Sequence, residues 1–342
     1  MDVDPARVWS VPSAADTIVT WEYDEGRERL LRLYEKGKRR QWDGADRLDW
    51  TTQVDPDNPL GTRDDEVPIF GSPTWSRLGA ADRSTLVRHL AAWQFSQFLH
   101  GEQGGLICAA RIIQTVPDID SKYFAATQVI DEARHAEVFA RFVREKIGLT
   151  YPIDAGLRAL LDDVLSDRRW DITYLGVQVL IEGLGLAAYQ IVRDSTTNPL
   201  ARAITAYVME DEARHVAFGR IALADHYREL STAELDEREE FCIEALAVMR
   251  QRFLCHQVWA MLGYDVDECV QAVETSAAQQ AFRRLLFSRI VPTLRDIGLL
   301  SERVRGHLAG MDINGFESVD LDRAERADAL SARIADASRA PG

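Results

Sequence analysis

Residues 131–135 read Asp-Glu-Ala-Arg-His, and residues 211–215 repeat the same five residues 80 positions later. The glutamate of each copy follows a lone glutamate, Glu102 or Glu182, by 30 positions. Two residues three positions apart on an α-helix project within about 60° of each other, so the Glu and His of each copy can hold one metal ion between them. The doubled pattern predicts a four-helix site for two metal ions.

Turn-forming residues lie near the middle of both intervals. Pro117 is close to the midpoint of the first, and Asn198-Pro199 follows the midpoint of the second. Proline ends helices and Asn-Pro favours turns, so each interval is predicted to be a helical hairpin. Two such hairpins packed antiparallel bring all the ligands to one level of a bundle. The predicted metal ligands are Glu102, Glu132, His135, Glu182, Glu212 and His215.

The alternative is a charged bundle seam without metal. A single Glu-x-x-His is weak evidence, but two copies with matching upstream glutamates are not. Glu182 lies within the apolar segment 179–186, where a bare buried carboxylate is costly unless it is neutralised or coordinated. The pattern therefore favours metal.

The Asp-Glu-x-Arg-His form, over about residues 85–225, resembles the carboxylate-bridged di-iron proteins of the ferritin-like superfamily, most closely their oxygenase branch. The resemblance implies an all-α, ferritin-like four-helix bundle with additional flanking helices. It also implies two iron ions, with Glu132 and Glu212 bridging and Glu102 and Glu182 terminal. Oxygen-rich ligation with two histidines suits iron or manganese, so a mixed Mn/Fe centre is an alternative.

In that family the aspartate before each ligand glutamate and the arginine after it surround the ligands. The pseudo-twofold of the repeat pairs Asp131 with His215 and Asp211 with His135, with Arg134 and Arg214 balancing the aspartates. Such partners fix the imidazole tautomer and raise ligand basicity. The alternative for the arginines is an ordinary ion pair at the bundle surface.

Two positions distinguish this chain from related branches. Arylamine N-oxygenases carry a further histidine ligand one turn before the last ligand glutamate, where this chain has Val208. Ribonucleotide reductase small subunits have their radical tyrosine one turn after the first ligand histidine, where this chain has Phe139. These departures argue against that N-oxygenase subtype and against a stable tyrosyl radical at Phe139.

The resemblance implies a non-haem di-iron, O2-activating monooxygenase that hydroxylates or N-oxygenates a small organic substrate. No flavin, Fe-S or nicotinamide motif is present, so the electrons are expected from an external reductase or ferredoxin. The alternatives are a di-metal oxidase or radical-generating protein like a ribonucleotide reductase small subunit, and a ferroxidase or iron-binding protein.

Side chains one turn from the ligands are predicted to line the substrate pocket. They are mostly apolar, which suits an organic substrate with a small polar handle. The predicted pocket residues are Leu106, Gln128, Phe139, Gln178, Leu186, Val208 and Phe218. Four glycines, Gly104, Gly105, Gly183 and Gly185, flank the lone glutamates and indicate either room or helix distortion beside the metals, or close helix packing.

The rest of the chain is expected to complete one helical domain, residues 1–342, around a bundle at about 82–229. An N-terminal helix at 21–42 and an irregular stretch at 51–73 belong to the N-terminal part, 1–81. The irregular stretch either covers the substrate entrance or crosses the bundle end. C-terminal helices are predicted within 231–320, starting at the capping box Ser231–Glu234 and including 266–290 and 300–309, and then a loose helical tail at 321–342.

Composition excludes several functions. The net charge of −15 argues against nucleic-acid binding, even though residues 36–40 are basic. No apolar run approaches the length of a membrane span, and no signal peptide precedes the chain. Cys108, Cys242, Cys255 and Cys269 show no metal or redox spacing, which is typical of buried thiols in the cytoplasm. A homodimer is left open.

Overall fold

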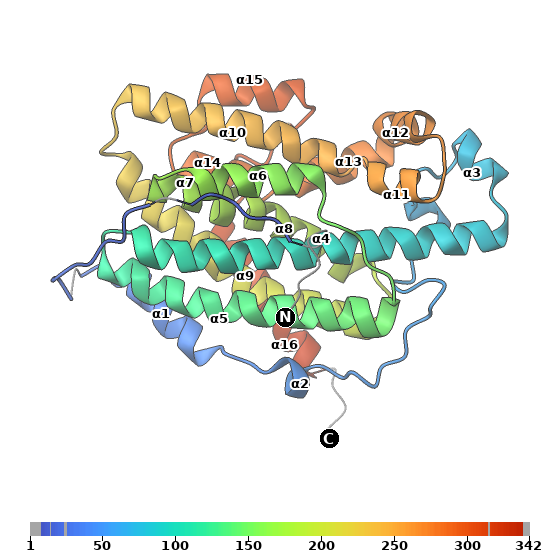
Figure 1. Cartoon of the computed structure of the whole chain (residues 1–342), viewed down its shortest axis with the longest axis horizontal. Helices are drawn as coiled ribbons and strands as arrows, with labels where there is room; N and C mark the ends of the chain where they lie inside the picture. Colours follow the sequence, from blue (N-terminus) through green and yellow to red (C-terminus); the bar gives the residue numbers. More distant parts are fainter. Residues whose placement is uncertain (1–7, 14, 24–25, 314, 338–342) are drawn as a thin grey trace.

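The computed structural model describes residues 8–13, 15–23, 26–313 and 315–337, and within these ranges every regular element is helical. The all-α prediction is confirmed. Two long helical hairpins form the centre of the molecule, and shorter helices cover it (Figure 1).

The first hairpin consists of α4 (Ala80–Thr115) and α5 (Ile119–Phe142), which run side by side along the molecule (Figure 1). The turn lies at Pro117, as predicted. Asp118 then caps α5, because its carboxylate accepts a hydrogen bond from the Ser121 amide at 2.8 Å.

The second hairpin begins with one apolar helical stretch, Trp170–Ser195, made of α7 (Trp170–Tyr174), the π-helix η4 (Leu175–Ile181) and α8 (Glu182–Ser195). It returns through α9 (Pro199–Tyr227), which is capped by Asn198 and has Pro199 in its first turn. The turn again lies where the sequence predicts it. α5 packs against α9 and closes the four-helix bundle.

The stretch Trp170–Ser195 is also the one helix among the described residues that is long and apolar enough to cross a membrane. Its most apolar window has a mean hydropathy of 1.5, but 83% of that window is buried inside the molecule. A core helix of a soluble protein passes the same test, so the stretch is weak evidence for a membrane span.

The N-terminal helix is shorter than predicted. α1 spans Glu28–Arg39, not 21–42, because Gly26 adopts a left-handed conformation, φ 67°, that a right-handed helix cannot continue. Three short elements follow it and leave most of 51–73 irregular, as predicted: α2 (Gly44–Arg47), η2 (Asp64–Glu66) and α3 (Pro73–Arg77).

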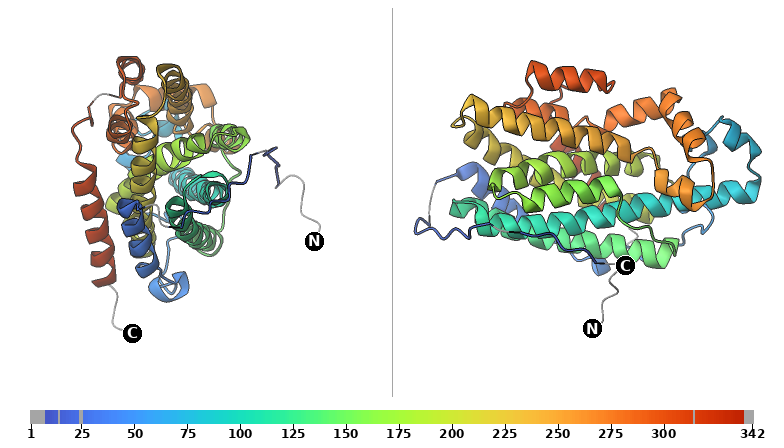
Figure 2. Two further views of the ribbon diagram at one scale, coloured as in Figure 1. Left: turned by 90° about the vertical axis from the view of Figure 1, so that its left-hand side faces the viewer. Right: turned by 45° about the horizontal axis from the view of Figure 1, so that its top comes forward.

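The C-terminal helices cover one side and one end of the bundle (Figures 1 and 2). The capping box at Ser231 and Glu234 starts α10 as predicted. The predicted helix at 266–290 is divided at Ser276, whose side chain caps a second helix. The remaining elements are η3 (Val143–Ile147), α6 (Ala155–Ser166), α10 (Thr232–Arg252), α11 (His256–Met261), α12 (Val266–Thr275), α13 (Ala277–Leu286), α14 (Ile290–Asp296), α15 (Glu302–Gly310) and α16 (Leu321–Ala337).

The predicted tail is a helix that packs on the bundle. α16 lies along α9 (Figure 2), and Lys36 of α1 forms an ion pair with Glu325 of α16 at 2.6 Å. The last residues of the predicted tail, 338–342, lie outside the described residues. Buried apolar side chains form one cluster from Leu30 to Ala332, which is what a single domain requires, and the domain limits stay a prediction.

Candidate metal centre

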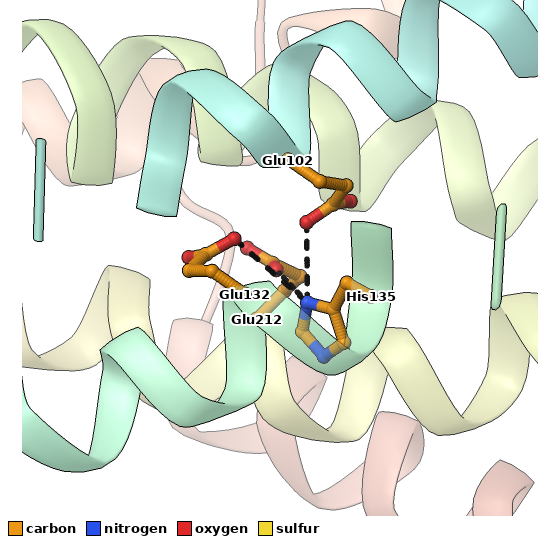
Figure 3. Close-up of side chains that lie close together, drawn as sticks. All are labelled: Glu102, Glu132, His135 and Glu212. Atoms are coloured by element: carbon orange, nitrogen blue, oxygen red, sulfur yellow. Dashed lines mark hydrogen bonds and ion pairs between the residues drawn. The ribbon is translucent and has the colours of Figure 1, made fainter. Parts of the chain in front are cut away.

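The six predicted ligands come together in the middle of the bundle. Glu102 lies on α4, while α5 and α9 contribute the Glu-x-x-His pairs, and Glu182 is the first residue of α8. All six side chains are at most 6% exposed. Figure 3 shows the half of the site formed by Glu102, Glu132, His135 and Glu212.

The ligand atoms form two overlapping groups of four, and within each group they lie within 4.8 Å of one another. One group contains Glu102 and His135, and the other contains Glu182 and His215. Glu132 and Glu212 belong to both groups. Two shared and two unshared carboxylates are the arrangement that two bridging and two terminal ligands require, and the individual roles stay a prediction.

Both imidazoles direct Nδ1 into the cluster. His135 Nδ1 lies 3.1 Å from a Glu102 oxygen and 3.0 Å from a Glu212 oxygen (Figure 3). His215 Nδ1 lies 3.2 Å from a Glu132 oxygen and 3.6 Å from Glu212. The Nδ1 lone pairs are therefore the imidazole atoms available to a metal.

Several of these inward atoms have no hydrogen-bond partner among the described residues although they are buried. They are both carboxylate oxygens of Glu212, one oxygen of Glu182 and Nδ1 of His215. A buried polar atom without a partner is costly, and coordination to a cation removes that cost. The residues present therefore fit two metal ions, and the oxygen-rich donor set suits iron or manganese.

The electrostatics of the cluster also favour bound cations. Burial and the charge of Glu212 raise the pKa of Glu102 to about 8 and that of Glu182 well above its usual range. Burial opposes the charge of Glu212, but His215 and His135 lower its pKa to about 2. Burial also opposes charge on the imidazoles, but the surrounding carboxylates raise their pKa well above the usual range. The cluster thus needs positive charge, which protons or metal cations can supply.

The second nitrogen of each imidazole contacts the predicted aspartate of the opposite repeat. His135 Nε2 lies 3.1 Å from Asp211 Oδ2, and His215 Nε2 lies 3.3 Å from Asp131 Oδ2. The crossed pairing predicted from the pseudo-twofold is therefore present in the structure. A carboxylate at Nε2 favours a proton there, which leaves Nδ1 free to bind a metal.

The two arginines join both aspartates in a buried network. Arg134 donates to Asp131 and, at 3.0 Å, to Asp211, and Arg214 donates to Asp211 at 2.5 Å and to Asp131 at 3.1 Å. Both guanidinium groups are buried, Arg214 completely. This placement differs from an ordinary ion pair at the bundle surface.

Sequence reasoning missed two residues of this network, Gln41 and Trp42. Gln41 donates to Asp131 at 2.8 Å and accepts from Arg134 at 2.8 Å, and the Trp42 indole donates to Asp211 at 2.8 Å. Both follow α1 and lie about 90 residues or more before the aspartates in sequence. No local pattern marks them, because their role depends on how the N-terminal segment packs across α5 and α9.

A narrow cavity of about 60 Å³ adjoins the carboxylates. Its walls come mainly from α4 and α8, and Glu102, Glu132, Glu182 and Glu212 are among its lining residues. The other lining residues are Trp93, Gln94, Gln97, Phe98, Gly101, Gly105, Leu157, Ile181, Leu184, Gly185, Ala188, Tyr189, Arg252 and Phe253. The Tyr189 hydroxyl donates a short hydrogen bond to Glu102.

None of the seven predicted pocket residues lines this cavity. Gln128 donates to Glu132 at 3.1 Å and Glu182 at 2.8 Å, and Gln178 donates to Gln128 at 3.3 Å, so both amides support ligands. Phe139 stacks on Tyr189 from behind the wall. Of the others, Phe218 packs on Phe124, Leu186 lines a separate small cavity, Val208 is buried, and Leu106 is half-buried.

The difference has a geometric reason. The cavity is lined mainly by the two helices that carry the lone glutamates, α4 and α8. Side chains one turn from the ligands on α5 and α9 instead point into the core. On α4 and α8 the positions that line the cavity are Phe98 and Gly105 around Glu102, and Gly185 and Tyr189 beyond Glu182.

Two of the four glycines that flank the lone glutamates leave room beside the ligands, and the other two allow close helix packing. Gly105 and Gly185 line the cavity, and a Cβ on Gly105 would lie 2.8 Å from a Glu132 oxygen. Gly104 and Gly183 allow close packing, because a Cβ there would lie 2.7 Å from Leu161 and 3.1 Å from Ile290. Helix distortion is present too: η4 is a π-helix that ends directly before Glu182, and π-helical turns are frequent at functional sites.

A larger, outer cavity of about 330 Å³ shares Trp93, Gln94 and Phe253 with the inner one. Residues 60–68 contribute five of its lining side chains. The irregular N-terminal stretch therefore forms part of the wall of the outer cavity. Whether the stretch covers the substrate entrance or crosses the bundle end stays a prediction.

The chain was compared with known proteins. The family model of the p-aminobenzoate N-oxygenase AurF matches residues 24–298. Comparison with curated proteins gave no match. Among solved structures, two point mutants of an R2-like ligand-binding oxidase with anaerobically reconstituted Mn/Fe cofactor are similar. The first has a TM-score of 0.52 at 17% identity and covers 82% of this chain and 97% of its own. The second has a TM-score of 0.52 at 16% identity, with coverage of 81% and 98%.

At these identities the oxidase structures establish the fold, a ferritin-like helical bundle. The family match covers most of the chain and all six predicted ligands, and it extends across Val208. A buried carboxylate and histidine cluster that could hold two metal ions lies within the matched region. The chain belongs to the p-aminobenzoate N-oxygenase AurF family, and it is a ferritin-like di-iron oxidoreductase.

Proposed function

We propose that this protein is an O2-dependent monooxygenase that inserts one oxygen atom into a small organic molecule, by hydroxylation or N-oxygenation. Glu102, Glu132 and His135 on one hairpin would hold two iron ions together with the matching residues of the other hairpin. Bound iron would supply the activation of O2. The electrons would come from an external reductase or ferredoxin.

One observation supports this proposal above the others. Two overlapping groups of four buried ligands lie beside a cavity lined by apolar and aromatic side chains. An iron-storage or ferroxidase site has no need for an organic cavity at the ligands, whereas an oxygenase must bring an organic molecule there.

The residues of the chain have distinct tasks in this proposal. Asp211 and Asp131 hold protons on the Nε2 atoms, so that both Nδ1 atoms stay available to metal. Gln128 holds Glu132 and Glu182 in place by donating to both. The aromatic wall around Phe98 and Tyr189 excludes water from the carboxylates.

The test begins with the full-length chain loaded anaerobically with Fe(II) and mixed with O2 in a stopped-flow spectrometer. We expect two irons per chain and an iron-dependent absorbance change. Glu132→Ala should bind less than half of the iron and lose the change, because Glu132 belongs to both groups of ligands. Glu137→Ala, an exposed glutamate on the same helix, is the matched control and should behave like the wild type.

The reaction type is then read from the products. A panel of small aromatic amines and acids is incubated under ¹⁸O₂ with a chemical reductant, and mass spectrometry locates the label on carbon or nitrogen. Iron oxidation without any labelled product would favour a ferroxidase, and a persistent organic radical in electron paramagnetic resonance would favour a radical-generating oxidase. Wild-type behaviour of Glu132→Ala would contradict the ligand assignment.

A further inference from the structure

The inner cavity beside the metal centre and the larger outer cavity meet at a few side chains. Trp93, Gln94 and Phe253 line both cavities, whereas the ligand carboxylates line the inner one alone. A side chain that borders two cavities lies between them. Trp93 and Phe253 are the large aromatic members of this boundary, and we call this pair the aromatic partition. It separates the inner cavity, with its carboxylates, from the outer cavity.

The two cavities differ in what they can hold. The inner cavity has a volume of about 60 Å³, and the outer cavity has a volume of about 330 Å³. A cavity of about 150 Å³ is large enough for one benzene molecule. A molecule of that size therefore fits in the outer cavity, but it reaches the ligand carboxylates only if a wall of the inner cavity moves.

Trp93 is firmly held. It lies within the long helix α4 and is 5% exposed. Its indole donates a hydrogen bond of 2.8 Å to the side-chain oxygen of Gln257, whose amide donates in turn to the backbone oxygen of Ile153 at 3.3 Å. Turning the indole away would leave a buried N–H without its acceptor, which is costly. Trp93 is therefore the fixed member of the aromatic partition.

Phe253 is held by fewer interactions. It directly follows the last residue of α10, and it is half-buried. Among the described residues its ring contacts one other ring, that of Phe282, with the ring centroids 5.9 Å apart. Unlike an indole, a phenyl ring has no hydrogen bond to lose when it turns. Phe253 is therefore the member of the aromatic partition that can move.

The backbone next to Phe253 also allows movement. Residues 253–255 connect α10 to α11, and Cys255 has a φ of 56°, a left-handed conformation that is uncommon for residues other than glycine. Backbone positions of this kind cluster at ligand clamps and switch regions. Residues at the ends of helices commonly absorb the changes in backbone angles that open and close a site. A small change in this connection would displace the ring of Phe253.

The outer cavity is suited to hold an organic molecule. Most of its lining side chains are apolar or aromatic, among them Leu60, Leu90, Ile191 and Phe282. Its volume lies at the lower end of the usual range for ligand pockets, roughly 300–1,000 Å³. Burial of apolar surface against these side chains would stabilise the bound molecule.

We propose that the substrate binds first in the outer cavity, and that Trp93 and Phe253 select by size which molecules pass from there to the metal centre. Phe253 turns aside to admit a narrow molecule, and Trp93 forms the fixed opposite edge that stops wider ones. This inference rests on the proposed oxygenase function and specifies how the substrate of that function is selected. The two residues determine specificity through the width of the opening between them, independently of charge.

Proton NMR relaxation of neutral probes tests the proposal without relying on turnover. Benzene and the wider naphthalene are added to the full-length chain loaded with Mn(II), and the metal-free chain is the reference. Bound Mn(II) relaxes the protons of nearby molecules, and this effect falls steeply with distance. We expect both probes to bind the wild type, and the relaxation per bound molecule to be several-fold faster for benzene than for naphthalene, which stays in the outer cavity.

Variants of Phe253 separate size selection from a structural role. Phe253→Ala should raise the relaxation of naphthalene several-fold, to the level of benzene, and Phe253→Leu should give an intermediate value. Phe253→Trp should lower the relaxation of both probes. Leu90→Ala enlarges the outer cavity alone and is the matched control, so relaxation per bound molecule should equal that of the wild type. The Mn(II) content of each variant shows whether its metal centre is intact.

Each outcome decides the proposal. It is overturned if naphthalene relaxes at the wild-type rate in both Phe253→Ala and Phe253→Leu, or if the wild type relaxes both probes equally or binds neither. It is also overturned if Leu90→Ala has the same effect as Phe253→Ala, because the volume of the outer cavity would then decide. Size selection at Phe253 in a chain without iron-dependent O2 consumption would contradict the oxygenase function but not the aromatic partition.

Discussion

Each histidine of the centre has two different surroundings. Nδ1 faces carboxylates whose inward oxygens have few or no hydrogen-bond partners, and Nε2 faces an aspartate held by arginines. Because a metal ligand must present a lone pair, the hydrogen bond on the far side decides which nitrogen can bind. Besides facing His135, Asp211 accepts hydrogen bonds from Trp42 and from both Arg134 and Arg214, which hold its carboxylate in place.

Asp211→Asn should weaken metal binding by about 10- to 100-fold, the usual effect of losing a partner of this kind. The neutral amide no longer balances the two arginines and no longer favours the proton on His135 Nε2. Competition with a calibrated chelator measures the affinity. Asp225→Asn, an exposed position on the same helix, should leave it unchanged. Equal affinities for Asp211→Asn and wild type would show that the network does not orient the ligand.

Gln128→Leu tests the amide that joins two carboxylates. The leucine keeps the volume of the side chain but removes the donor. Glu132 Oε1 then loses a hydrogen bond of 3.1 Å, and Glu182 Oε1 loses one of 2.8 Å. We expect about tenfold weaker binding of at least one metal ion. Gln190→Leu removes an amide that contacts Arg289 instead, and its metal affinity should match the wild type. A Gln128→Leu protein with unchanged metal content and affinity would contradict this role.

At the scale of elements, the helices that carry the lone glutamates differ from their partners. Glycines on α4 and α8 make room for the ligands and for close neighbours, and the π-helix η4 shifts the register of the second apolar helix just before Glu182. An extra residue in one helical turn changes which side chains face inward. Local helix geometry thus places Glu182, whereas Glu102 lies within the regular helix α4 and the Glu-x-x-His pairs follow ordinary helical spacing.

Gly105→Ala should reduce iron binding to well below two ions per chain. Its Cβ would lie 2.8 Å from an oxygen of Glu132, a distance that forces the shared carboxylate to move. Gly101→Ala, one turn earlier on the same helix, meets no neighbouring atom and should stabilise α4 by about 0.5–1 kcal/mol without loss of metal. Elemental analysis and urea unfolding measure the two effects. Full iron content in Gly105→Ala would mean that Glu132 has more freedom than the packing indicates.

At the scale of the whole molecule, one buried cluster concentrates charge in a protein of net charge −15. Four carboxylates share this cluster with two imidazoles. The positive charges of the two surrounding arginines balance the negative charges of the two surrounding aspartates. Cations that bind the folded chain but not the unfolded chain stabilise it, so the metal centre also affects folding.

The stability of the metal-free protein should fall as the pH rises from 7 to 9. The pKa of Glu102 is raised to about 8, and those of Glu182, His135 and His215 are also raised, so the folded chain binds more protons than the unfolded chain in this range. Stability therefore decreases with pH until these protons are lost. Groups with lowered pKa, such as Glu212 at about 2, lose their contribution only in acid.

Thermal unfolding after chelation, compared with the iron-loaded protein, measures this dependence. The Tm of the metal-free protein should drop from pH 7 to pH 9, and the drop should be smaller with iron bound, because metal ions replace the protons. Glu102→Gln should also reduce the drop. A metal-free Tm that is constant or rises over this range would contradict the protonation of the cluster.

The sequence by itself determined the parts of this protein that depend on local spacing. The repeated Asp-Glu-Ala-Arg-His, the intervals of 30 residues and the prolines between them were sufficient to predict four helices and both turns. The crossed aspartate–histidine pairs also needed the resemblance to the di-iron family, which implies that such aspartates accept from the ligand histidines. Helical periodicity and turn chemistry act over a few residues, so they can be recognised in the sequence alone.

Only the tertiary structure decided which face of the bundle opens into a cavity and which distant segments complete the centre. Gln41, Trp42 and Arg252 approach the centre from segments outside the four helices that carry the ligands, and no pattern in their own sequence indicates what they contact. The predicted pocket residues do not line the cavity, and four of them, Gln128, Phe139, Val208 and Phe218, lie on α5 and α9, whereas the cavity walls come mainly from α4 and α8. Side-chain packing across helices fixes that choice, because it depends on the volumes of many neighbours at once and not on the spacing along any one helix.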